Sequence, residues 1–199
     1  MNRVLIQPFE RFLQQQGYHR IAGVDEAGRG ALAGPVVASA VVLPFNCSIP
    51  GLTDSKQLTP KQRDDLFIEI EKSAVAVSVG CVGNEEIDRV NILQATLIAM
   101  SEAIERISPL PDFVLVDGTQ LPPISVRAHA IPKGDCLYQS IAAASIIAKV
   151  KRDRFMIELG KVYPHYGFQR HKGYGTRQHR QAISKVGVCP IHRRSFKLQ

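Results

Sequence analysis

The 199-residue chain lacks the sequence features that define several classes of protein. Its longest apolar stretches, near residues 36–43 and 141–148, are far shorter than the about 20 residues that a membrane-spanning helix needs. Residues 1–16 mix charged residues among apolar ones and hold no apolar core of a signal peptide. No internal repeat or low-complexity linker interrupts the chain. We therefore expect a cytoplasmic protein with no membrane segment.

The four cysteines form no C-x-x-C pair. Cys189 and His192 are spaced like half of a zinc site, but no second pair with credible spacing completes it. Free thiols in a reducing compartment are the simpler interpretation. A phosphate loop of the type G-x-x-x-x-G-K-[ST] is also absent, and residues 28–34 are one residue too long for G-x-G-x-x-G. A nucleotide-binding enzyme is therefore disfavoured.

Charge is present in quantity but unevenly spread. Residues 1–148 hold 12 Lys and Arg against 16 Asp and Glu, a net charge of −4, whereas residues 149–199 hold 13 against 2, a net charge of +11. An acidic body with a basic last quarter suggests a catalytic core beside a surface that holds a polyanion, although a basic tail can also serve solubility alone. Aromatic residues interleaved with the basic ones favour nucleic acid, because their rings can stack on bases or sugars. These residues are Tyr163, Tyr166, Phe168 and Tyr174.

Asp25 and Glu26 are adjacent carboxylates at the end of an apolar run, and a glycine-flanked Arg29 follows them. A strand that delivers two carboxylates into a glycine-rich turn builds an acidic pocket beside open backbone N–H groups, which suits divalent cations and a phosphate. A solvated Asp-Glu turn is the structural alternative. Asp117 similarly ends an apolar strand before Gly118, where a turn-forming Asp-Gly is the alternative. Asp135 opens a run of small residues, where it could cap a helix.

The periodicity predicts alternating strands and helices. Strands are expected at residues 20–26, 36–43, 74–82, 113–117 and 125–130. Helices are expected at residues 60–72, 84–107 and 135–159, with a short one near 176–186. Thr59 and Pro60 have the residue types of an N-cap and a first helical position, and Asn84 is a plausible cap of the next helix. The pattern indicates a mixed α/β sheet with helices packed on it.

Together these positions resemble one family closely, that of bacterial ribonuclease HII. The matching segments run in order along essentially the whole chain: Asp25-Glu26-Ala27-Gly28-Arg29-Gly30, Gly34-Pro35, Asp54-Ser55-Lys56, Asn91-Ile92-Leu93-Gln94-Ala95-Thr96, Val116-Asp117-Gly118, Lys133-Gly134-Asp135, Ser140 to Lys149, His171-Lys172-Gly173-Tyr174-Gly175-Thr176 and His192-Arg193-Arg194-Ser195-Phe196. One departure is Ala31, where the family usually carries proline. The missing proline frees one φ angle at a cost of about 0.4–1 kcal/mol but removes no chemical group.

The resemblance implies a ribonuclease H-like mixed sheet flanked by helices, with a helical C-terminal appendage. It divides the chain into a catalytic core at residues 1–158 and a basic appendage at 159–199 of the same single domain. It also implies about two Mg²⁺ or Mn²⁺ ions, which would neutralise four mutually repelling carboxylates and promote hydrolysis of a phosphodiester. The implied catalytic and metal-binding residues are Asp25, Glu26, Asp117 and Asp135. Asp153 lies 18 residues beyond Asp135 and is interpreted as a salt-bridge partner of neighbouring basic residues.

In the family a glycine-arginine-glycine loop and a tyrosine detect the ribose 2′-OH, the group that separates RNA from DNA. By resemblance these are Gly28, Arg29, Gly30 and Tyr174, while Lys56 resembles a phosphate contact; for Tyr174 alone, a surface aromatic is the alternative. The implied activity is hydrolysis of RNA in RNA–DNA hybrids and cutting 5′ of ribonucleotides embedded in duplex DNA, by a monomer. A non-catalytic hybrid-binding protein is the competing interpretation, but it would not need all four carboxylates.

Overall fold

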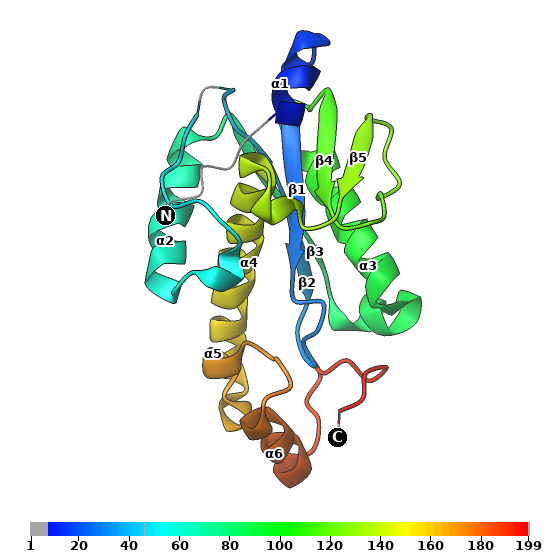
Figure 1. Cartoon of the computed structure of the whole chain (residues 1–199). Coiled ribbons are helices and arrows are strands. Elements are labelled where there is room, and N and C mark those ends of the chain that lie inside the picture. Colours follow the sequence, from blue (N-terminus) through cyan, green and yellow to red (C-terminus); the bar gives the residue numbers. More distant parts are fainter. Residues whose placement is uncertain (1–7, 46, 199) are drawn as a thin grey trace.

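Val-, Ile- and Ala-rich segments form a five-stranded sheet in the computed structural model, which describes residues 8–45 and 47–198 (Figure 1). The strands are β1 (Ile21–Ala27), β2 (Val36–Val42), β3 (Ala76–Val82), β4 (Phe113–Asp117) and β5 (Ala128–Ile131). They lie in the order β3-β2-β1-β4-β5. β2 is antiparallel to both β1 and β3, whereas β4 is parallel to both β1 and β5. The prediction of a mixed α/β sheet is confirmed.

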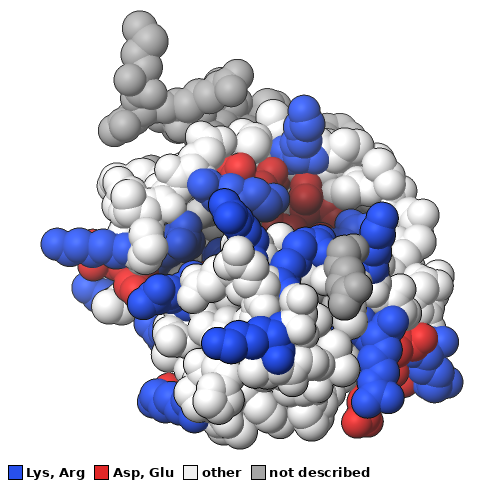
Figure 2. Space-filling model, turned by 90° about the horizontal axis from the view of Figure 1, so that it is seen from below, with Lys and Arg blue, Asp and Glu red and all other residues white. Residues whose placement is uncertain are grey.

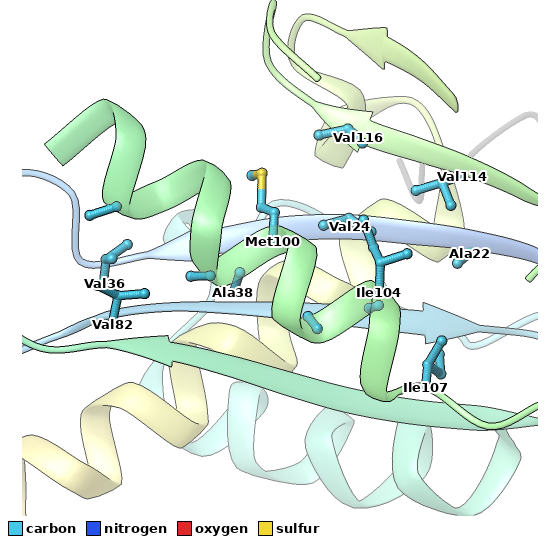
Figure 3. Close-up of a cluster of buried hydrophobic side chains, with 14 of the residues drawn as sticks. Ala22, Val24, Val36, Ala38, Val82, Met100, Ile104, Ile107, Val114 and Val116 are labelled. Carbon is cyan, nitrogen blue, oxygen red and sulfur yellow. The ribbon is translucent and has the colours of Figure 1, made fainter. Parts of the chain in front are cut away.

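Helices cover both faces of this sheet because alternate residues of each strand point to opposite sides. α3 (Asn84–Arg106) packs on one face, where Ala22 and Val24 of β1 join a cluster with Met100 and Ile104 (Figure 3). α4 (Gln139–Val162) and α2 (Pro60–Ser73) lie on the other side of the sheet in Figure 1 and share a second cluster. Asp25 alternates with Val24 and therefore faces the side on which α4 packs.

Two of the sequence-based helix caps have different outcomes. Thr59 caps α2 as expected, since its Oγ1 accepts the N–H of Gln62 and Pro60 occupies the first helical position. The cap of α3 is Gly83 rather than Asn84, so that prediction is wrong. The side chain of Asn84 instead donates to the carbonyl oxygen of Pro190, a partner distant in sequence.

The predicted helix at residues 135–159 begins later than expected. Asp135 lies in a 3₁₀ turn, η2 (Gly134–Cys136), and α4 starts at Gln139 with Tyr138 as its N-cap. The turn is held by Asp117, whose Oδ1 accepts the Gly134 N–H at 2.7 Å. The interpretation of Asp135 as a helix cap is therefore wrong, because a tertiary hydrogen bond fixes the backbone into the turn before the helix can begin.

Smaller differences concern elements at the sheet margin. α1 (Pro8–Gln15) was not expected, and it buries Leu13 against Ile21 and Leu115. β5 begins at Ala128, three residues later than predicted. The prediction that residues 1–16 form no signal peptide rests partly on residues 1–7, which lie outside the described residues. None of the described helices is long and apolar enough to cross a membrane.

The C-terminal region packs beneath the sheet, next to the loop that follows β1 (Figure 1). It contains η3 (Pro164–Tyr166), α5 (Phe168–His171) and α6 (Arg177–Val186). Its own cluster combines Leu32 and Ala33 of the loop with Met156, Phe168 and further apolar residues. Among the described residues the four cysteines remain unpaired.

Candidate active site

Asp25 and Asp117 stand at the ends of neighbouring parallel strands. Val24 is in register with Val116, so the next residue of each strand emerges at the same edge of the sheet. Asp25 is only 4% exposed, and its Oδ1 accepts the N–H of Glu26 at 2.7 Å. The sheet therefore brings Asp25, Glu26 and Asp117 together, as the sequence predicted for a carboxylate cluster.

Asp135 approaches the cluster from the turn before α4. The bond from Gly134 N–H to Asp117 Oδ1 ties this turn to the end of β4. Asp135 is 6% exposed, and Asp117 is among the charges that act on its carboxyl group. Asp117 also acts on Asp25 and on Glu26, so its charge raises the pKa of each of the other three carboxyl groups.

Burial and mutual repulsion disfavour ionisation of these carboxyl groups. Burial is the largest cause that raises the pKa of Asp25 well above its usual value, and the charges of Glu26 and Asp117 raise it further. The pKa of Glu26 is raised by burial despite the opposing effect of Arg29, whose Nη1 lies 3.5 Å from Glu26 Oε1. The pKa of Asp135 is raised by burial and then by Asp117. Bound cations would relieve this repulsion.

Asp54 and Cys136 join the site although no role was predicted for them. One ligand atom each from Asp54, Asp135 and Cys136 lies within 4.8 Å of the others, a grouping that could hold a metal ion. Asp54 stands in the Asp-Ser-Lys segment, where sequence reasoning gave a role only to Lys56. Asp54 was therefore part of a segment that the resemblance had singled out, but its place near Asp135 could not be predicted. The loop reaches the site through a tertiary contact, in which Ser55 Oγ lies 2.9 Å from Ser145 Oγ of α4.

Lys56 sits among the carboxylates. Burial lowers the pKa of Lys56, but the charges of four carboxylates outweigh it and the pKa is raised overall. These carboxylates are Asp54, Asp25, Asp135 and Glu26. The ammonium group therefore supplies positive charge inside the acidic cluster, where the sequence had suggested a phosphate contact.

Figure 2 views the molecule from the end that carries α5 and α6, and it shows acidic side chains recessed in a hollow with Lys and Arg side chains around it. A pocket of about 330 Å³ lies between α2, α4 and α5. Its lining includes Arg63, Lys149, Arg170, Lys172 and Tyr174. A basic pocket of this kind suits a polyanion backbone.

The loop after β1 is held by two arginines that are completely buried. Arg152 donates to the carbonyl oxygens of Pro35 at 2.9 Å, Lys172 at 3.0 Å and Ala33 at 3.2 Å. Arg193 donates to those of Gly34 at 3.0 Å and Arg29 at 2.8 Å. Both side chains are 0% exposed, so they act inside the protein and are not available to a polyanion.

Tyr174 meets the glycine-arginine-glycine loop, as the resemblance implies. It forms an isolated antiparallel bridge with Ala31, and the Leu32 N–H donates to the Gly173 carbonyl oxygen at 2.8 Å. Lys149 Nζ and the guanidinium carbon of Arg152 each lie 5.3 Å from the centre of the Tyr174 ring. The chain thus unites its candidate ribose-reading residues although they are far apart in sequence.

Of two sequence-based interpretations of the basic last quarter, one is wrong and one is confirmed. Tyr166 and Phe168 are buried and stack on each other at 5.3 Å, so their predicted stacking on bases is wrong. They serve the core instead, because the short C-terminal helices need apolar cover. Asp153 is confirmed as a salt-bridge partner, with its Oδ1 2.8 Å from Lys149 Nζ.

Ala31 uses the N–H group that a proline would lack. Its N–H donates to the Gly28 carbonyl oxygen at 3.3 Å, and the residue is fully buried. This turn and the bonds from Arg193 to Gly34 and Arg29 fix the loop without proline. The freedom gained at residue 31 is therefore partly offset by contacts from the rest of the chain.

Comparisons with known proteins agree with this arrangement. The family model described as Ribonuclease HII matches residues 22–199. The chain is similar to Ribonuclease HII of Geobacter sulfurreducens, with 56% identity over 95% of this chain and 87% of the relative. Among solved structures it is similar to ribonuclease H2 from Pyrococcus horikoshii, with a TM-score of 0.74 and 30% identity over 90% of this chain and 94% of the other. It is also similar to RNase HII from Archaeoglobus fulgidus, solved in complex with PCNA, with a TM-score of 0.74 and 29% identity over 90% and 96%.

Proposed function

Because the chain belongs to the ribonuclease HII family, we propose that it cuts on the 5′ side of ribonucleotides embedded in duplex DNA and leaves 3′-hydroxyl and 5′-phosphate ends. Its broader activity is that of a metal-dependent endonuclease of the ribonuclease H type, which hydrolyses RNA in RNA–DNA hybrids. The observation that carries the proposal is the convergence of Asp25, Glu26, Asp117 and Asp135 at one end of the β1–β4 pair, beside a basic pocket.

The four carboxylates suit hard divalent cations. They supply oxygen ligands. The pKa values of Asp25, Glu26 and Asp135 are raised by burial and by neighbouring carboxylates, as expected at a site that binds cations. We propose these residues as the ligands of about two Mg²⁺ or Mn²⁺ ions, with Asp54 close enough to assist Asp135. When bound, such ions supply activation of water and stabilisation of the leaving oxygen.

Substrate selection falls to residues around the carboxylates. Gly28, Arg29 and Gly30 present their backbone beside the site, where glycine permits a close approach to a sugar. We propose that this loop and Tyr174 read the ribose 2′-OH, and that the Tyr174 ring packs on the next deoxyribose. Lys56 would contact the phosphate that enters the acidic cluster. The bonds from Arg152 and Arg193 keep the loop in place before substrate arrives.

We further propose that residues 1–158 form the catalytic core and residues 159–199 its basic appendage, and that the protein acts as a monomer. The boundary falls inside α4, which continues to Val162. A continuous helix across the boundary favours one rigid unit, in which the appendage supplies Tyr174 and basic groups to the site of the core.

A duplex with one embedded ribonucleotide tests the function. Incubation with Mg²⁺ or Mn²⁺ should give one cut 5′ of the ribonucleotide, and removal of the metal with a chelator should abolish it. Asp117→Asn serves as the matched inactive protein. An equally rapid cut in an all-DNA duplex, or cutting that survives chelation, would show that the proposal is wrong.

Tyr174 can be tested with the same duplex. Tyr174→Phe keeps the ring and should cost about 0.5–1.5 kcal/mol of transition-state stabilisation, the net worth of one hydrogen bond, whereas Tyr174→Ala should cost more. The measured quantity is the ratio of kcat/KM on the single-ribonucleotide duplex to kcat/KM on a continuous hybrid. Equal losses on both substrates would assign junction selectivity to the Gly28–Gly30 loop alone.

A further inference from the structure

Three buried side chains outside the carboxylate cluster form a continuous hydrogen-bonded chain that ends on the backbone of Tyr174. His192 contacts Cys189, His179 contacts His192, and His179 contacts the Tyr174 carbonyl oxygen. We propose that His179 and His192 are positioning residues that set the backbone of Tyr174 through one fixed pair of imidazole tautomers. This inference rests on the proposed role of Tyr174 in reading the ribose.

The donor and acceptor of each hydrogen bond follow from the last contact, between His179 and Tyr174. His179 Nδ1 lies 3.0 Å from the Tyr174 carbonyl oxygen, which can only accept a hydrogen bond. Nδ1 must therefore carry the proton. Burial lowers the pKa of His179 to about 4, so the ring is neutral at pH 7 and its Nε2 carries no hydrogen.

His192 must then donate to His179. The two Nε2 atoms lie 3.1 Å apart, and a bare nitrogen on His179 requires an N–H on His192. Burial also lowers the pKa of His192, so its Nδ1 is the bare nitrogen of a neutral ring.

The surroundings of His192 Nδ1 agree with this assignment. It accepts the Cys189 N–H at 2.9 Å and lies 3.1 Å from the Cys189 thiol, a second donor. The Cys189 carbonyl oxygen, 3.2 Å away, already accepts the backbone N–H of His192 at 3.1 Å. Every group in the chain is thus satisfied by one arrangement of protons.

The hydrogen bonds of His179 and His192 matter because they add a buried side-chain contact to the irregular backbone around Tyr174. Residues 172–175 belong to no helix or regular strand, and Tyr174 forms an isolated bridge with Ala31. Its other backbone bonds are local: the Tyr174 N–H donates to the His171 carbonyl oxygen at 2.9 Å, and the Tyr174 carbonyl oxygen accepts the Thr176 N–H at 2.8 Å. A third buried histidine, His171, supports the neighbouring residue, since its Nδ1 accepts the Gly173 N–H at 3.3 Å and its Nε2 donates to the Tyr166 carbonyl oxygen at 2.8 Å. The rings of His171 and His179 stack with their centres 4.5 Å apart.

Apolar side chains could fill the same volume, but they would not select one backbone position. Exchanging the tautomer of either His179 or His192 would place two N–H groups or two bare nitrogens against each other at 3.1 Å. Exchange at His179 would also leave the Tyr174 carbonyl oxygen facing a nitrogen lone pair. Because lone pairs or N–H groups that face each other are costly in a buried place, one pair of tautomers satisfies the network, and in it the Tyr174 carbonyl oxygen accepts from both Thr176 N–H and His179 Nδ1–H.

Two substitutions of His179 separate its two contacts. Asn places an amide donor near the position of Nδ1–H, so His179→Asn keeps the bond to Tyr174 and removes the one to His192. Gln reaches the position of Nε2, so His179→Gln keeps the bond to His192 and removes the one to Tyr174. Both remove an imidazole from the same buried place, which makes each the control for the other.

The readout is again the ratio of kcat/KM on the single-ribonucleotide duplex to that on the continuous hybrid, with melting temperature measured alongside. His179→Gln should lower the ratio about fivefold, the factor carried by one net hydrogen bond, and His179→Asn should lower it less than about twofold. Losses that are equal on both substrates and follow melting temperature would overturn the proposal, because they indicate a structural role only.

Tyr174→Ala in the same assay distinguishes the two levels of inference. If it lowers the ratio while His179→Gln leaves it unchanged, the positioning role is wrong and the reading of ribose by Tyr174 stands. If Tyr174→Ala itself leaves the ratio unchanged, both are wrong. The unsubstituted protein offers an independent test, since ¹⁵N NMR should find the Nδ1–H tautomer at His179 and the Nε2–H tautomer at His192. The opposite pair would overturn the proposal.

Discussion

Gly23 of β1 and Ser140 of α4 touch through their backbones. A Cβ atom built on Gly23 would lie 2.1 Å from the Ser140 carbonyl carbon and 2.3 Å from the Ile141 nitrogen. The helix can approach the strand this closely only because residue 23 has no side chain. Ser39, in register with Asp25 on β2, adds a hydrogen bond from its Oγ to the Ala144 carbonyl oxygen at 2.7 Å. These contacts set the distance between the strand that carries Asp25 and the helix that follows Asp135.

Gly23→Ala should therefore damage both stability and catalysis. The added methyl group meets backbone atoms that cannot rotate away, so we expect a loss of about 1–3 kcal/mol in the free energy of unfolding. The displaced α4 should also lower the single-turnover rate under conditions where the protein remains folded. Urea unfolding and single-turnover cleavage measure the two effects. Gly83→Ala is the control, because no heavy atom lies within 4 Å of its added Cβ; equal behaviour of the two variants would contradict the prediction.

The sequence predicted elements whose signals are local. The sheet strands carry dense Val and Ile, and Thr59 with Pro60 marks the start of α2 by side-chain chemistry alone. Asn91 shows where local signals fail. It has φ 69° and interrupts α3, with its Oδ1 accepting the N–H groups of Leu93 and Gln94, while the apolar pattern continues as if the helix were straight. The hydrophobic periodicity does not reveal the kink, because Asn91 itself caps the second half of α3.

The residues of the candidate site can likewise be separated into those that local sequence signals predict and those that they do not. Asp25 and Asp117 could be predicted because each ends an apolar strand, and parallel strands bring such residues to one edge. Asp54 could not be placed by that argument, since its loop reaches the site through the contact between Ser55 and Ser145. Arg152 and Arg193 belong to the basic last quarter, for which the sequence predicts a surface that holds a polyanion. Their burial depends on loop carbonyls distant in sequence, which no local pattern contains.

Asp135→Asn should separate folding from metal binding. Asp135 does not cap α4, so the substitution should leave the melting temperature in a chelator unchanged or slightly higher, because repulsion with Asp117 and Asp54 disappears. The cleavage rate in Mg²⁺ should fall by more than about 100-fold, the upper range for loss of even an outer partner of a metal ligand. The rise in melting temperature on adding Mn²⁺ should also shrink. A rise equal to that of the unsubstituted protein would exclude Asp135 as a ligand.

Arg152→Met should destabilise the protein by about 3 kcal/mol or more. The change removes the donor of two buried carbonyl oxygens, those of Pro35 and Ala33, and of the partly buried one of Lys172, and each unpaired buried group costs about 1–3 kcal/mol. Arg152→Lys should recover only part of this, because an ammonium group lacks the fork that reaches three acceptors. Arg154→Met is the control on the same helix: it removes an exposed pair with Asp64 and should cost about 1 kcal/mol. Equal unfolding free energies for Arg152→Met and Arg154→Met would argue against the proposed role of Arg152 in holding the loop after β1.

Arg170 and Lys172 line the basic pocket, so their neutralisation should weaken the binding of duplexes of any sequence. For Arg170→Gln with Lys172→Gln, the slope of log binding constant against log salt should fall by roughly one unit for each phosphate that the protein no longer neutralises. Metal-induced changes in melting temperature should hardly change. Arg106→Gln, on α3 at the opposite face of the sheet, is the control. A slope that changes as much in the control would show that the pocket has no particular role.

The buried histidines should make the protein less stable as pH falls. Burial holds the pKa of His179 at about 4, below the about 6.5 expected in the unfolded chain, so the unfolded state takes up a proton first between these values. For His179 alone, unfolding should become easier by about 2 kcal/mol between pH 7 and pH 5. The lowered pKa values of His171 and His192 act in the same direction.

The metal-free carboxylates oppose this trend, because an acid whose folded pKa is raised stabilises the folded state as pH falls. The total curve therefore mixes both contributions, and the informative quantity is the difference between the unsubstituted protein and His179→Asn. The amide of Asn does not titrate, so the variant should lose less stability than the unsubstituted protein between pH 7 and pH 5. Urea unfolding at the two pH values measures this difference. Parallel losses in the two proteins would mean that His179 is not held neutral by its burial, and the assignment of its bare Nε2 would fall with it.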